Sequence, residues 1–183
     1  MSPAPPRGGF VTATAAVSLA LGGLGVASNG LQLLLAWALP PVGLSTGLLP
    51  PGAPLPPAIT WLETHLAALS LAGIALSALL AVVAWGLLRR REWARYAFIA
   101  GLVLAALANF AGLPLLDPLF AGLMDGIAPP DLDPAQLQAA THTLQQAAFW
   151  ACLAGAVLIA AVHGWIAWKL CRPEIRAEFR HAP

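Results

Sequence analysis

Four long apolar stretches divide the chain, and each is long enough to cross a membrane as a helix. A transmembrane helix needs about 20 consecutive apolar residues, because the hydrocarbon layer of a bilayer is roughly 30 Å thick. The stretches span residues 10–39, 61–88, 93–113 and 143–170. The second and third are separated by only a few residues, so these two helices must be antiparallel neighbours. The pattern predicts an all-α membrane protein, an antiparallel four-helix transmembrane bundle that forms a single integral membrane domain over residues 1–183.

Two long loops, residues 40–60 and 114–142, join the first span to the second and the third span to the fourth. The first loop holds seven prolines and therefore cannot form a helix or a central strand. In the second loop, residues 115–124 are apolar enough for a short interfacial helix. A buried re-entrant turn would give the same pattern, so both interpretations stay open.

The fourth span is predicted to belong to a helix that is longer than the membrane is thick. Asp133-Pro134-Ala135-Gln136 is typical of a helix start, with a capping carboxylate, proline at the first helical position and glutamine three residues after the cap. No helix breaker follows until Pro173. We therefore expect a helix of about 38 residues, roughly 57 Å long at 1.5 Å per residue. Residues 174–183 are expected to form a charged tail.

Charge is scarce, and its placement predicts how the chain sits in the membrane. Only 9% of the residues are charged and the net charge is +1, which gives no basis for a general attraction to nucleic acid. All nine Lys and Arg residues fall on one side of the predicted spans, at Arg7, at Arg89–Arg95 and at Lys169–Arg180. Cytoplasmic loops carry the excess of such residues, so both termini are expected in the cytoplasm and both long loops outside.

The first apolar stretch has a second interpretation, as a secretory signal peptide with Gly25-Val26-Ala27 as its small-residue cleavage site. The apolar core of a signal peptide is about 7–15 residues long. Here the apolar run extends from Phe10 to Leu39. Its length favours a membrane-spanning helix.

Each span carries small or polar residues at intervals of three or four, which places them on one face of a helix. Helices in lipid associate through close approach of small residues and through interhelical hydrogen bonds, because lipid chains are as apolar as leucine. We expect these faces to meet inside the bundle. In span order they are Ser18, Gly22, Gly25, Asn29 and Gln32; Ser70, Gly73, Ser77, Ala81 and Ala84; Ala97, Gly101, Ala105 and Asn109; and Gln145, Ala148, Cys152, Gly155 or Ala156, Ile159 and His163.

Polar side chains gather in the predicted outer half of the spans. They are Asn29, Gln32, Glu63, His65, Asn109, His142 and Gln145. Ionisable groups inside a membrane usually face a cavity or one another, so one interpretation is a polar pocket that opens outward, with Glu63 as its most costly member. The other is structural, with amides that hydrogen-bond between helices and ionisable groups that reach water. The histidines and carboxylates have no diagnostic metal-ligand spacing, and no metal or cofactor is predicted.

No motif for catalysis is found in the sequence. The chain lacks GxSxG, and no Ser or Cys is paired in sequence with a plausible base, so no enzyme is predicted. The basic run has a different role. Arg89, Arg90, Arg91 and Arg95 are expected to orient the chain and to bind anionic lipid head groups, at about 1 kcal/mol for each side chain near the surface.

The segment Gly86–Arg95 joins the end of a span to this basic run and then to Trp-Ala-Arg. It resembles the cytoplasmic hairpin of many small, uncharacterised bacterial inner-membrane proteins. The ending Trp168–Phe179 is similar to the tails of such proteins. The resemblance implies a multi-pass protein of the bacterial inner membrane with four spans, and it implies no activity.

Two functions from different classes fit these observations. The first is a non-enzymatic accessory or assembly subunit that lies in the lipid bilayer and binds a membrane-protein partner or forms a homo-oligomer. Added bulk at Gly22, Gly73 or Gly101 would affect such a protein most. The alternative is a binder or carrier of a small molecule, lipid or ion through the outward-facing polar pocket, which would be most sensitive at Glu63, His65 and Asn109.

Overall fold

A computed structural model describes residues 9–38, 57–116 and 134–180. Within these residues the chain forms five α-helices and one short 3-10 helix, and it forms no strand. The elements are α1 (Gly9–Ala38), α3 (Pro57–Leu88), α4 (Glu92–Ala111), η1 (Leu113–Leu115), α6 (Pro134–Leu170) and α7 (Pro173–Arg180).

Four of these helices are long and apolar enough to cross a membrane, namely Gly9–Ala38, Thr60–Leu88, Glu92–Ala111 and Gln138–Leu170. The four predicted spans are thus found as helices, with ends that differ by a few residues. α6 contains 37 residues and begins at Pro134, as the capping pattern predicts. Many large apolar side chains on the four helices are exposed, which suits contact with lipid chains.

The predictions for the long loops fall largely outside the described residues. This holds for residues 40–56 of the first loop and for residues 117–124 of the predicted interfacial helix. α3 begins at Pro57, four residues before the predicted start of the second span.

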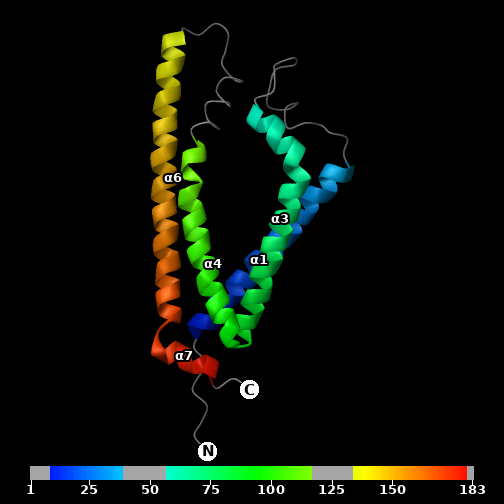
Figure 1. Cartoon of the computed structure of the whole chain (residues 1–183), viewed down its shortest axis with the longest axis vertical. Coiled ribbons are helices and arrows are strands. Elements are labelled where there is room, and N and C mark those ends of the chain that lie inside the picture. Colours follow the sequence, from blue (N-terminus) through cyan, green and yellow to red (C-terminus); the bar gives the residue numbers. More distant parts are fainter. Residues whose placement is uncertain (1–8, 39–56, 117–133, 181–183) are drawn as a thin grey trace, which may run out of the picture.

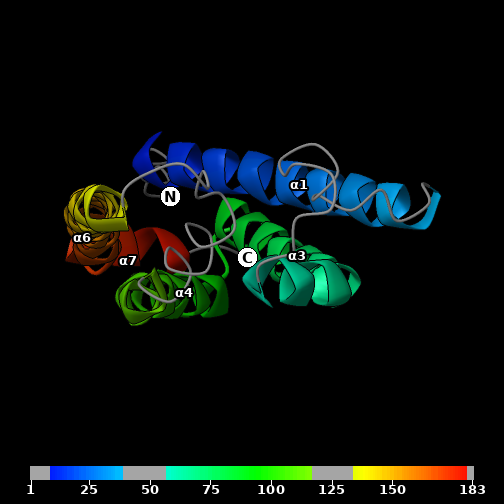
Figure 2. The ribbon, with the colours of Figure 1, turned by 90° about the horizontal axis from the view of Figure 1, so that it is seen from above.

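The four long helices alternate in direction and form two pairs (Figure 1). α1 packs along α3, and α4 packs along α6. All four helices come together at the end of the molecule that holds the turn between α3 and α4 and also α7; we call this end the base. Toward the opposite end, the α1/α3 pair and the α4/α6 pair diverge, as both views show (Figures 1 and 2).

The small-residue faces of α1 and α3 meet as the sequence predicts. A Cβ atom placed on Gly22 would lie 2.9 Å from the backbone nitrogen of Ala81 and 2.9 Å from the backbone oxygen of Ser77. A Cβ on Gly25 would meet the Ser77 side chain, and one on Gly73 would overlap a side chain of α1. The lack of side chains at these glycines therefore lets the two backbones approach closely.

The corresponding faces of α4 and α6 do not approach each other as closely as those of α1 and α3. A Cβ placed on Gly101 or on Gly155 would meet no atom within 4 Å. The expectation that Gly101 packs against a neighbouring helix is therefore wrong. Of the two alternatives on the fourth span, Ala156 is buried whereas Gly155 lies beside open space.

The buried apolar core lies at the base. Its side chains come from every long helix and from α7: Val11, Ala15, Val83, Leu87, Ala94, Phe98, Leu170, Ile175 and Phe179. The segment predicted as a charged tail is helical from Pro173 to Arg180, which corrects the prediction. Ile175 and Phe179 lie one turn apart on α7 and are both buried, so α7 closes the base.

The turn between α3 and α4 depends on one residue in an unusual backbone conformation. Arg90 has φ of 55°, in the left-handed region that residues other than glycine seldom adopt. Its N–H donates to the Leu87 oxygen at 3.0 Å, and the N–H of Arg91 donates to the Gly86 oxygen at 2.9 Å. A Cβ on Gly86 would lie 2.7 Å from the Ala94 Cβ, so glycine lets α4 begin directly against α3.

Candidate functional site

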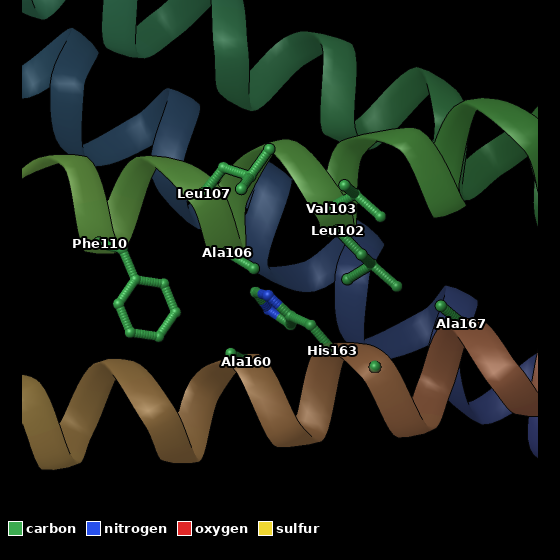
Figure 3. A pocket seen from close by; sticks show the side chains of 9 residues that line it. Leu102, Val103, Ala106, Leu107, Phe110, Ala160, His163 and Ala167 are labelled. Carbon is green, nitrogen blue, oxygen red and sulfur yellow. The ribbon is translucent and has the colours of Figure 1, made fainter.

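A half-open cavity of about 180 Å³ lies between α4 and α6 (Figure 3). Five residues of α4, from Leu102 to Phe110, and four residues of α6, from Ala160 to Ala167, line it. His163 is the one polar side chain among these nine. The cavity forms because α4 and α6 do not close against each other as α1 and α3 do.

The imidazole of His163 extends from α6 toward α4 and lies beside Ala106 (Figure 3). The sequence predicts an inward face of the fourth span that includes Cys152, Ile159 and His163. His163 lines the cavity, whereas Cys152 and Ile159 are exposed, so this prediction is correct only in part. Its Nδ1 atom is buried and has no hydrogen-bond partner among the described residues. A buried polar atom without a partner costs about 1–3 kcal/mol, so His163 gains from any rearrangement that gives this nitrogen a hydrogen-bond partner.

Four of the seven residues predicted to form an outer polar pocket lie on the α1/α3 pair. Asn29 is partly buried, and its Nδ2 donates to a backbone oxygen one turn earlier in α1 at 2.8 Å. Glu63 is partly buried, and its Oε1 is closed off without a hydrogen-bond partner in the described part of the chain. Gln32 and His65 are exposed. Nδ1 of His65 lies 2.9 Å from the backbone oxygen of Trp61, on whose ring the imidazole stacks.

The other three predicted residues lie on the α4/α6 pair. Asn109 and His142 are exposed, and Gln145 is partly buried. The two helix pairs diverge, so the seven residues fall into two separate groups (Figures 1 and 2). None of the seven lines the cavity between α4 and α6. Ligand binding by this set stays a prediction.

The four arginines predicted to meet lipid head groups have two different environments. Arg89 and Arg91 are exposed, as that prediction requires. Arg90 and Arg95 are only 8% and 2% exposed and lie within the base. The basic run therefore divides into a surface part, for which head-group contact stays a prediction, and a buried part that joins helices.

The buried arginines connect α7 and the C-terminal end of α6 to the rest of the base. Arg90 Nη2 forms an ion pair with Glu178 Oε2 of α7 at 3.2 Å and donates to the Thr12 hydroxyl of α1 at 3.0 Å. Arg95 Nη1 donates to the backbone oxygen of Leu170, the last residue of α6, at 3.4 Å. The sequence did not indicate these contacts, since hairpin arginines are usually solvated.

Metal-ligating side chains are scattered over the described structure. Within residues 9–38, 57–116 and 134–180, no three His, Cys, Asp or Glu side chains lie close enough to hold a metal ion together. Cys152 and Cys171 are free and exposed.

The helices and the cavity define a class of protein. Its described residues are all-helical, four of the helices are long and apolar enough to cross a membrane, and an apolar cavity lies between two of them. Comparison of the chain with protein-family models, with curated proteins and with solved structures finds no match.

Proposed function

We propose that the protein is a multi-pass protein of the bacterial inner membrane and a non-enzymatic accessory or assembly subunit that binds another membrane protein through α6. The observation that carries the proposal is an exposed apolar face of α6 with a shallow hollow along it. Its lining residues all belong to α6 and run from Trp150 to Ala161. They recur at intervals of three or four, so they form one face of the helix.

The shape and exposure of this face suit a partner helix. Trp150, Val157 and Leu158 are each more than half exposed, whereas Ala154 and Ala161 supply small side chains between them. Ridges of large residues beside small ones are the surfaces into which a second helix packs. Only 6% of the most apolar part of α6 is buried within the described chain, less than in any of the other three long helices. α6 is thus the helix with the most surface left for another protein or for a second copy of the chain.

A matched pair of substitutions tests this face. Val157 lies in the hollow, and Val162 lies five residues later, about 140° around the helix at 100° per residue. Both are exposed, at 53% and 46%, so tryptophan fits at either position without disturbing the fold. The protein is extracted from its own membranes in mild detergent and studied by native mass spectrometry.

The wild type and Val162→Trp are expected to carry a stoichiometric second polypeptide or a second copy of the chain. Val157→Trp is expected to lose it. Equal complexes for the two variants, or a lone chain in all three samples, would contradict the proposal.

The proposed orientation places both termini in the cytoplasm. It is supported by the grouping of all nine Lys and Arg residues on one side of the spans. Reporter fusions at Leu48 and Asp131 are expected to report an outside location, and a fusion after the C-terminus a cytoplasmic one. A cytoplasmic signal from either loop would overturn the orientation.

A second candidate function is a binder or carrier of a small molecule, lipid or ion through the outer polar residues. The buried, unpartnered Oε1 of Glu63 favours it, because a carboxylate oxygen closed off from water gains from a bound donor or cation. Glu63→Gln is then expected to lose a small mass that the wild type retains in native mass spectrometry. Glu174→Gln, a change at an exposed carboxylate of α7, serves as the control and should retain that mass.

A further inference from the structure

We propose that the cavity between α4 and α6 binds a small lipophilic phenol, a single aromatic ring that carries a hydroxyl group, with His163 as its hydrogen-bond partner. The site uses none of the outer polar residues and no part of the hollow on α6. It therefore does not rest on the function proposed above.

The volume of the cavity fits a ligand of about one aromatic ring. An apolar cavity of about 150 Å³ in another protein stays free of water and binds benzene. The cavity here measures about 180 Å³ and is lined by eight apolar residues and His163. It is half-open, so a substituent on the ring can extend beyond it along the helices.

His163, the polar residue in the wall of the cavity, favours a ring that carries one polar group. The imidazole of His163 has no hydrogen bond within the described chain, and its Nδ1 is closed off. A half-turn of the ring about the Cβ–Cγ bond exchanges nitrogen and carbon positions with little change of shape, so the side chain can present a nitrogen to an occupant. A hydroxyl can donate to the neutral imidazole or accept from it.

Other ligand classes match the cavity less well. A hydrocarbon chain leaves the imidazole without a partner. A charged molecule would be desolvated against eight apolar residues that offer no opposite charge. A metal ion would find only one ligand, since the other eight lining residues have no coordinating side chain. Phe110 at one end of the cavity adds an aromatic contact for a ring.

Fluorine NMR on the full-length protein in detergent tests the proposal with two probes that differ by one hydroxyl group, 4-fluorophenol and fluorobenzene. Detergent without protein sets the background from partitioning of each probe. After this correction, we expect 4-fluorophenol to bind about 3- to 10-fold more tightly, the contribution of one net hydrogen bond. Equal affinities would overturn the role of His163.

Three variants and a control separate the cavity from its polar group. His163→Phe is expected to remove the preference for the phenol, and His163→Gln, which keeps a hydrogen-bonding group, to retain much of it. Ala106→Phe fills the cavity and is expected to abolish saturable binding of both probes. Val162→Phe, on an exposed face of α6, should change neither. A preference that survives in His163→Phe, or saturable binding that survives in Ala106→Phe, would contradict the proposal. If Ala106→Phe fails to fold, the two His163 variants decide.

Discussion

The two helix pairs of this chain contain similar small residues and yet pack in different ways. In the α1/α3 pair, Gly22, Gly25 and Gly73 each lie directly against the other helix. In the α4/α6 pair, Gly101 and Gly155 lie beside open space, and a cavity of about 180 Å³ separates the helices. In this chain, small residues therefore bring two helices together only where the small residues of both helices lie directly opposite each other.

The side chains that face each other explain the difference. α3 places Ser77 and Ala81 opposite the glycines of α1, so backbone meets backbone. Between α4 and α6 stand the larger side chains of Phe110 and His163, which line the cavity and occupy the space where the helices would otherwise meet. The first pair is thus a closed structural unit, and the second has room for another molecule.

The largest effect is expected at the base, where α7 joins the two pairs. Removing one partner of a buried ion pair leaves the other charge uncompensated, so Glu178→Ala should lower the free energy of unfolding by about 3 kcal/mol or more. Glu174→Ala, on the exposed side of α7, should change it by less than about 1 kcal/mol. Unfolding in mixed micelles, followed by circular dichroism during a titration with SDS, measures both. Equal effects would mean that α7 does not hold the pairs together.

The next largest effect is expected in the α1/α3 pair. Gly22→Ala places a methyl group 2.9 Å from backbone atoms of α3, which cannot rotate away, and should cost about 1–3 kcal/mol. Gly23→Ala, the same change at the neighbouring residue, meets open space and should stabilise α1 by up to about 1 kcal/mol through helix propensity. The same SDS titration compares the two variants. The two changes in the free energy of unfolding are expected to have opposite signs, and a similar change in both variants would contradict the close contact at Gly22.

The smallest effect is expected in the α4/α6 pair. Gly101→Ala adds a methyl group that meets no atom within 4 Å, so only helix propensity changes. The free energy of unfolding should rise by up to about 1 kcal/mol. A loss comparable to that of Gly22→Ala would show that α4 is closed against a neighbour at this height and that the contrast between the pairs is wrong.

The sequence predicts the four long helices and the small-residue faces by which two of them pack. Hydrophobic runs identify the four long helices, and Asp133-Pro134 identifies the first turn of α6, because both signals are local. The spacing of Gly22, Gly25, Gly73 and Ser77 predicts faces that pack inside the bundle, since period and size together define a face, and the structure brings those of α1 and α3 together.

The remaining features depend on contacts between distant segments. Residues 173–180 carry alternating charges and resemble a solvated tail, and only the apolar base to which Ile175 and Phe179 dock makes them a buried helix face. The position of a polar residue in a span predicts its depth in the membrane. It does not predict which of the other helices the side chain faces. For this reason the sequence places Glu63 and Asn109 in one predicted pocket, although they lie on helix pairs that diverge.

The most direct test of the account is disulfide cross-linking between α1 and α3 in native membranes. In a background with Cys152 and Cys171 replaced by serine, Gly25→Cys is combined with Ser77→Cys. A Cβ at Gly25 lies 3.0 Å from the Ser77 Cβ, close to the spacing of about 3.5–4.5 Å in disulfides, so a small adjustment permits the bond. Mild oxidation is predicted to give a nearly complete bond within one chain, while Gly23→Cys with Ser77→Cys gives none. Absence of the first bond, or equal yields from both pairs, would contradict the close packing of α1 on α3.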